Sequence, residues 1–93
     1  MKKIEITEDN LPIILAFLGR KINAIEGVTA GVKMSKTQRP YILVKTKNKK
    51  YAVVYYFLHK NYKAFDLSDD TGYIFHKASE LYNFFMLEQW FEE

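Results

Sequence analysis

The side chains best suited to catalysis in this 93-residue chain are two histidines and a group of aspartates. His59 and His76 have the chemistry of a general acid and base, and Asp66, Asp69 and Asp70 lie between them in the sequence. Such groups catalyse hydrolysis when one orients another or when several hold a metal ion. Their spacing supports neither arrangement, so the sequence predicts no catalytic residue.

The segment that runs from Asp66 to Gly72 imitates the start of a calcium-binding loop. Asp66, Ser68 and Asp70 alternate as the first calcium ligands do, but Gly72 falls one position late and no glutamate follows at the required distance. Because Asp, Ser and Gly favour turns, we predict a turn here. The chain has no cysteine, which excludes a thiolate zinc site, and we predict neither a metal ion nor a cofactor.

Sequence signatures of other enzymes are also missing. The chain has no glycine-rich phosphate loop, no Walker lysine and no Gly-x-Ser-x-Gly elbow. A small basic ribonuclease of the toxin type can work with a lysine, a tyrosine and a histidine on a sheet, so it is the enzymatic alternative. The main expectation is a protein that is not an enzyme.

Length and composition indicate one folded domain over residues 1–93. Of the residues, 48% are hydrophobic and 16% aromatic, which suits a packed core rather than disorder. The longest apolar runs, 11–18 and 51–58, are well short of the ~20 residues that span a bilayer. Acidic residues interrupt the N-terminal segment where a signal peptide would be apolar. We therefore expect a cytoplasmic protein without membrane contact.

Apolar periodicity predicts the elements that must position any functional side chain. Residues 2–7 alternate as a short strand does, and a helix follows, with Asp9 or Asn10 as its cap and Gly27 at its end. Strands are predicted at 28–35, 41–46, 51–58, 62–67 and 73–75, and a last helix from about residue 77 towards residue 93. The run 51–58 is apolar on both faces, as a central strand would be. The predicted fold class is α+β: an antiparallel meander of about four to five strands, with an N-terminal and a C-terminal helix packed on one face.

Charge is segregated along the chain. The stretch between Gly27 and Phe65 contains nine cationic residues and no acidic one, whereas the rest has a net charge of −6 within an overall +3. This pattern predicts a cationic sheet that attracts a polyanion or an acidic partner. The residues predicted to bind are Lys33, Lys36, Arg39, Lys45, Lys47, Lys49, Lys50, Lys60, Lys63, Tyr51 and Tyr55. Aromatic rings beside cations suit single-stranded nucleic acid, although lysines also protect edge strands from aggregation.

The predicted C-terminal helix changes its apolar side part of the way along. Up to Phe85 the apolar residues share one stripe, but Leu87, Trp90 and Phe91 then fall opposite it, and Glu88 lies over the earlier stripe. The helix could stop near Met86 and fold back, could be buried on both sides, or could present Phe84, Leu87, Trp90 and Phe91 as a protein interface.

These features together favour a binding function. We expect a non-enzymatic macromolecule-binding protein, a small accessory inhibitor of the phage or mobile-element type that acts by occluding a partner protein. The C-terminal helix is expected to contact a protein partner or a second copy of the chain. The phage-type part rests on the composition, rich in Lys, Asn, Tyr and Phe. The first alternative is direct binding of single-stranded nucleic acid by the basic sheet, and the second is the ribonuclease.

Overall fold

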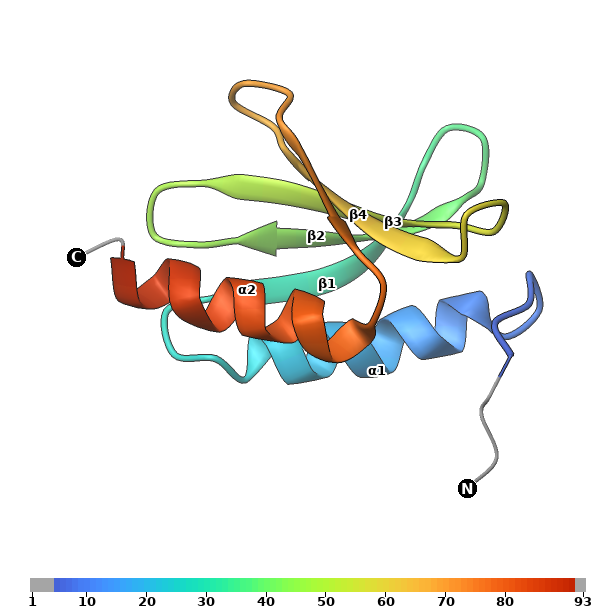
Figure 1. Cartoon of the computed structure of the whole chain (residues 1–93), viewed down its shortest axis with the longest axis horizontal. Coiled ribbons are helices and arrows are strands. Elements are labelled where there is room, and N and C mark those ends of the chain that lie inside the picture. Colours follow the sequence, from blue (N-terminus) through green and yellow to red (C-terminus); the bar gives the residue numbers. More distant parts are fainter. Residues whose placement is uncertain (1–4, 92–93) are drawn as a thin grey trace.

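One sheet of five antiparallel strands, preceded by one helix and followed by another, makes up the structure (Figure 1). The computed structural model describes residues 5–91, with side chains described from Glu5 to Glu88. Its elements are α1 (Leu11–Asn23), β1 (Thr29–Met34), β2 (Pro40–Lys45), β3 (Lys50–Tyr56), β4 (Asn61–Asp66), β5 (Gly72–Phe75) and α2 (Ala78–Phe91). The α+β meander predicted from the sequence is confirmed.

The order of the strands in the sheet is their order in the chain, β1-β2-β3-β4-β5. Each strand is followed by a short turn, and short turns join antiparallel neighbours. The first and third turns of the sheet therefore lie at one end, and the second and fourth at the other. The central strand is β3, as its two-sided apolar sequence predicted.

Both helices cover the same face of the sheet (Figure 1). The apolar stripe of α1 buries Leu11, Leu15, Leu18 and Ile22, as its period of 3.6 residues predicted. Side chains alternate between the faces of a strand, so every second strand residue faces the helices. The fully buried sheet residues of the core are Ile42, Val44, Tyr51, Val53 and Ala64.

Aromatic rings join α2 to the sheet. Phe85 is fully buried, and its ring centroid lies 5.3 Å from that of Tyr51 in an edge-to-face contact. Phe84 lies 5.0 Å from Tyr73 and 5.2 Å from Phe75, so it packs under β5. Edge-to-face and offset contacts are favourable because the positive edge of one ring meets the negative face of another.

The start of the chain differs from the prediction. Residues 5–7 form no strand, and residues 1–4 lie outside the described residues. Asn10 occupies the cap position of α1 but makes no side-chain capping bond; its Oδ1 instead accepts a hydrogen bond from the backbone N–H of Thr7 at 2.7 Å. Thr7 Oγ1 in turn accepts the N–H of Asn10 at 3.3 Å, a reciprocal pair like a capping box. These short polar bonds favour a helix start over the predicted strand.

The one-sided burial of α1 gives a test of the core. Leu15→Ala is expected to lower the free energy of unfolding by about 2–5 kcal/mol, because Leu15 is fully buried and truncation leaves a cavity. Ile13→Ala is the matched control, since Ile13 is 60% exposed on the same helix and should cost less than about 1 kcal/mol. Chemical denaturation measures both. Equal losses would contradict the described orientation of α1.

Candidate functional site: the open face of the sheet

The sheet has one face that neither α1 nor α2 covers, which we call the open face (Figure 1). The register of the strands and the alternation of side chains along them determine which residues lie on the open face. It consists of Thr29, Gly31 and Lys33 of β1, Tyr41, Leu43 and Lys45 of β2, Lys50, Ala52, Val54 and Tyr56 of β3, Asn61, Lys63 and Phe65 of β4, and Gly72 and Ile74 of β5.

The open face is cationic and has no carboxylate among these residues. Lys33, Lys45, Lys50 and Lys63 lie on it, and none of them has an ion pair within the described part of the chain. Lys45 and Lys50 are direct cross-strand partners. Like charges placed directly opposite one another destabilise a sheet, and no described ion pair compensates either lysine.

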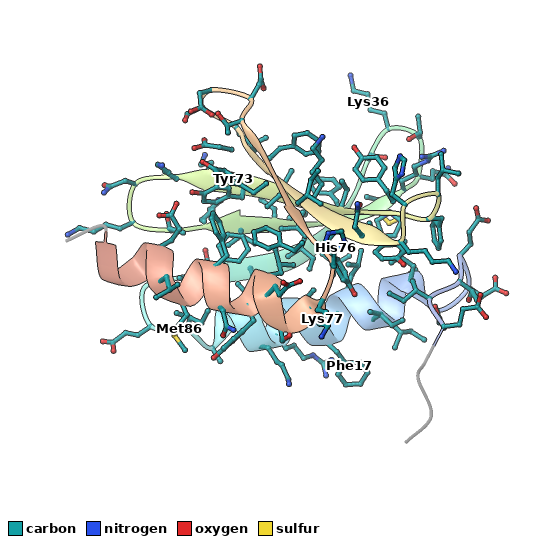
Figure 2. The ribbon with its side chains drawn as sticks, in the orientation of Figure 1. Phe17, Lys36, Tyr73, His76, Lys77 and Met86 are labelled. Atoms are coloured by element: carbon teal, nitrogen blue, oxygen red, sulfur yellow. The ribbon has the colours of Figure 1, made fainter. Side chains whose placement is uncertain are left out.

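The other predicted cations lie at the two ends of the sheet. Lys36 and Arg39 are exposed in the β1–β2 loop and Lys60 in the β3–β4 turn, so these three share one end. Figure 2 shows Lys36 pointing away from the body of the protein. Lys47 is exposed at the tip of the β2–β3 hairpin, at the opposite end. The structure thus divides the predicted site into a basic face, a basic end with Lys36, Arg39 and Lys60, and an opposite end that Lys47 shares with the aspartates of the β4–β5 turn.

The two tyrosines assigned to the polyanion site lie on the other side of the sheet. Tyr51 is fully buried against α2, and Tyr55 is half-buried on the same, helix-facing side. Tyr51 follows the outward Lys50 in β3, and Tyr55 precedes the outward Tyr56. Neighbouring residues of a strand point to opposite faces of the sheet. Neither ring is therefore placed to stack on a ligand at the open face. The aromatic residues on that face are instead Tyr41, Tyr56 and Phe65.

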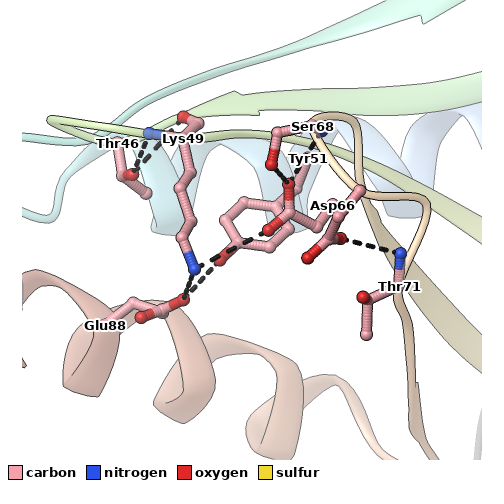
Figure 3. Close-up of polar contacts among 8 residues, drawn as sticks. Thr46, Lys49, Tyr51, Asp66, Ser68, Thr71 and Glu88 are labelled. Atoms are coloured by element: carbon pink, nitrogen blue, oxygen red, sulfur yellow. Dashed lines mark hydrogen bonds and ion pairs between the residues drawn. The ribbon is translucent and has the colours of Figure 1, made fainter.

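Lys49 also departs from the predicted basic surface. Its side chain reaches from the β2–β3 hairpin towards α2, where Nζ lies 3.7 Å from Oδ2 of Asp66 and 3.9 Å from Oε1 of Glu88 (Figure 3). The hydroxyl of Tyr51 donates a hydrogen bond to the same Glu88 oxygen. Asp66 Oδ1 accepts hydrogen bonds from the N–H and Oγ of Ser68, at 2.9 and 2.7 Å. We call Lys49, Tyr51, Asp66 and Glu88 the inner polar cluster.

The contacts within the inner polar cluster shift its ionisation. The hydrogen bonds from Ser68 hold the pKa of Asp66 below its usual value, and the positive charge of Lys49 acts in the same direction. Burial raises the pKa of the Tyr51 hydroxyl, and its hydrogen bond to Glu88 adds to this effect. The negative charge of Glu88 raises the pKa of Lys49. Each shift favours the protonation state that the contacts need, so the cluster ties α2 to the sheet.

Sequence reasoning missed the inner polar cluster, although one signal for it was present. Glu88 falls on the helical stripe that Leu81 and Phe85 bury, and such a residue needs a polar partner at that depth. Asp66 likewise occupies an inward position of β4 and is 1% exposed. Two carboxylates at core-facing positions, one on a strand and one on a helix, indicate that a cation or a hydroxyl group lies between them as their partner.

A cavity of about 710 Å³ lies beside the β3–β4 turn. Its lining includes the rings of Tyr55 and Tyr62 together with Lys60, His76 and Lys77. These are residue types that the ribonuclease alternative requires. Burial raises the pKa of Tyr62, however, which keeps its hydroxyl protonated and unsuited to act as a base.

Neither histidine ring has an orienting partner among the described residues. The backbone N–H of His76 donates to Oε1 of Glu80 at 3.1 Å, and that of Lys77 donates to the same oxygen at 3.0 Å. These bonds cap the start of α2 and leave the imidazole ring uninvolved. His59 is exposed in the β3–β4 turn. The described geometry therefore does not hold an imidazole as a general base is held in a catalytic triad.

The segment resembling a calcium loop forms the β4–β5 turn. Asp66 is committed to Ser68 and Lys49, and Asp69 Oδ1 accepts the N–H of Thr71 at 2.9 Å. The segment is a turn, as predicted, with Asp70 in the left-handed region at φ 61°. Among the described residues no three His, Asp or Glu side chains are grouped closely enough to hold a metal ion.

The predicted interface of the C-terminal helix is only partly visible. The helix does not stop near Met86 but continues to Phe91. Phe84 is half-buried among Tyr51, Tyr73, Phe75 and Phe85, so it belongs to the aromatic packing and not to an outward patch. Leu87 is 49% exposed. The side chains of Trp90 and Phe91 lie outside the described residues.

No family model, no curated protein and no solved structure matches this chain. Within the described part of the chain, no helix is long and apolar enough to cross a membrane. The function therefore has to be inferred from the surfaces themselves, and the open face is the one that combines charge, exposed rings and lack of a covering element.

Tyr51→Phe tests the link between Tyr51 and Glu88. It is expected to lower the free energy of unfolding by about 1.5–3 kcal/mol, since it removes a hydrogen bond to a charged group in a buried place. Tyr56→Phe is the matched control because Tyr56 is 39% exposed on the open face, and it should cost less than about 0.5 kcal/mol. Denaturant unfolding measures both. A neutral Tyr51→Phe would show that α2 does not depend on this bond.

The lowered pKa of Asp66 predicts a specific loss of stability in acid. Its folded pKa lies below its unfolded pKa of about 3.9, so its contribution is full above that value and is lost as the pH falls through the folded pKa. Asp66→Asn should flatten the acid limb of the stability curve, measured by urea unfolding from pH 6 to pH 2. Ser68→Ala should move the loss to higher pH, because it removes a donor to the carboxylate. An unchanged acid limb in both variants would contradict the assignment.

Proposed function

We propose that this protein is a non-enzymatic binding protein that docks the open face of its sheet on a polyanionic macromolecule and so occludes it. The observation that supports this most is the pairing of Lys45 directly opposite Lys50 on a face that has no carboxylate. Such a pair destabilises the free protein, and an anion bound between the two ammonium groups would relieve the repulsion. A stability cost at an uncovered surface is typical of a functional site.

The distribution of the other charges supports the same proposal. The described carboxylates lie in the helices, in the segments beside them and in the β4–β5 turn, whereas the strands contain only the inward Asp66. On the open face itself no carboxylate opposes the lysines, and Asp69 and Asp70 lie beyond it, in the β4–β5 turn. A one-sided positive field steers an anionic partner to this face and orients it there.

The half-buried apolar residues of the open face supply contact area between the charges. Leu43 and Val54 lie in the middle of the sheet, and Ile74 is 57% exposed at its edge. An ion pair alone contributes little in water, whereas covering apolar area adds a favourable term. Mixed cationic and apolar composition suits adhesion to a macromolecule better than it suits catalysis. Occlusion follows because a bound sheet shields the anion from other proteins.

Lys45→Glu tests the proposal with one substitution. The new glutamate faces Lys50 and pairs with it, so two cations are removed from binding while a repulsive pair becomes attractive. Affinity for heparin, a generic polyanion, should fall about tenfold or more at physiological salt, and the slope of log affinity against log salt should decrease by about two. The free energy of unfolding should stay equal or rise by about 0.2–1 kcal/mol.

Lys21→Glu is the matched control. Lys21 is exposed on α1, the helix on the opposite side of the sheet, and its substitution changes the net charge equally. At physiological ionic strength the Debye length is about 8 Å, so this distant charge should alter heparin affinity by less than about twofold. Equal losses in the two variants, or a wild-type protein without affinity for heparin, would contradict the proposal.

A further inference from the structure

Across the middle of the open face runs a row of five cross-strand neighbours, one from each strand, which we call the central row. Gly31 pairs with Leu43, Leu43 with Ala52, Ala52 with Phe65, and Phe65 with Gly72. The row begins and ends at a glycine and includes an alanine, so most of its floor has little or no side chain. A side chain added at Gly31 would meet nothing within 4 Å, which leaves that end of the row open.

Lysines border this central row on both sides. Lys45 and Lys50 lie two residues along the strands in one direction, and Lys33 and Lys63 lie two residues in the other. Since a strand rises about 3.3 Å per residue, the two lysine borders are roughly 13 Å apart at the backbone. Five strands at about 4.8 Å spacing give the row a length of roughly 19 Å. A narrow anionic chain lying across the strands would pass between cations on both sides.

Phe65 is the one aromatic ring in the central row, and it is half-buried there. Ala52 and Gly72 are both too small to shield the ring. Lys63 Nζ lies 5.0 Å from the ring centroid, within the range of a cation–π contact. Gly72 makes this position possible, because a Cβ there would lie 2.6 Å from Cε of Lys63. The row thus offers a ring for stacking with an ammonium group held next to it.

This combination selects one kind of polyanion. A ring beside a cation matches a base followed by its phosphate, and base stacking on aromatic side chains adds to phosphate pairing in proteins that bind single strands. A duplex keeps its bases stacked inside, so it would leave Phe65 unused. An acidic protein surface would use the lysines but would gain no stacking from the ring.

Resting on the proposed function, we propose that the central row is the track of a single-stranded nucleic acid. The nucleic acid crosses the sheet with one base stacked on Phe65. Its phosphates pass between two pairs of lysines, Lys45 and Lys50 on one side and Lys33 and Lys63 on the other. Four-stranded sheets that recognise RNA stack about two or three bases, and this row has comparable length. Recognition is tolerant of sequence, because every base has a face that stacks.

The experiment uses a labelled oligothymidylate of twelve nucleotides, its duplex with oligoadenylate, and heparin, measured by fluorescence anisotropy and competition at physiological salt. Phe65→Leu keeps the charge and an apolar side chain but removes the ring. Gly31→Val fills the open end of the row and favours the strand, because valine is a better strand former than glycine. Each variant should weaken single-strand binding about fivefold to 100-fold and leave heparin affinity within about twofold.

The control variant is Phe57→Leu, since Phe57 is 38% exposed but lies outside the open face, in the β3–β4 turn. It should bind the oligonucleotide as the wild type does. If the protein binds heparin but binds duplex and single strand with equal affinity, the track is overturned while the proposed function stands. The same conclusion follows if Phe65→Leu and Gly31→Val leave single-strand binding unchanged. Equally tight binding of a polyglutamate peptide would identify an acidic protein as the partner instead. A lack of heparin binding would overturn the proposed function as well.

Discussion

Both helices of this protein cover one face of its five-stranded sheet and leave the other uncovered (Figure 1), and this arrangement organises the whole molecule. Both helices lie on the same side (Figure 1), so the inward positions of the strands must be apolar and the outward positions remain in contact with water. Lysine suits an outward position because its long stem lies on apolar surface while its ammonium group stays hydrated. The position of the core thus explains why the outward side chains are polar or amphipathic, but not why so many of them are cationic.

The inner polar cluster marks the place where the core ends. Leu81 and Phe85 are fully buried, and Glu88 continues the same stripe of α2 one turn later. At that depth the sheet offers the hydroxyl of Tyr51 and the ammonium group of Lys49 in place of apolar side chains. The Glu88 carboxylate on the inward stripe therefore has hydrogen-bonding and charged partners there. The apolar pattern of α2 changes where the helix passes the end of the strands, at the β2–β3 hairpin.

Periodicity in the sequence was sufficient to predict the fold but not the composition of the site. The helical stripe of α1, the alternating strands and the two-sided apolar β3 each leave a local pattern, because burial repeats every 3.6 or every two residues. Of the predicted N-terminal strand only residues 5–7 are described, and these form no strand because the polar bonds between Thr7 and Asn10 start α1 there.

The site was harder to predict because charge along a sequence does not specify a face. Tyr51 and Lys50 are neighbours in the chain, yet alternation sends one into the core and the other to the open face. Lys49 lies in a hairpin, where no regular period applies, and only the fold shows that it turns towards Glu88. The central row, which joins residues from five strands, is defined by register and has no signature within any one segment.

The central claim is that the open face, and not the helical side, binds the polyanion, and methyl NMR tests it most directly. Adjacent residues of the same strands provide paired probes, with Leu43 and Val54 on the open face and Ile42 and Val53 beneath α1 and α2. During titration with a heparin oligosaccharide, the methyl signals of Leu43, Val54 and Ile74 should shift, while those of Ile42 and Val53 remain in place. Shifts confined to Ile13 and Leu87, which are exposed on the helices, would contradict the account.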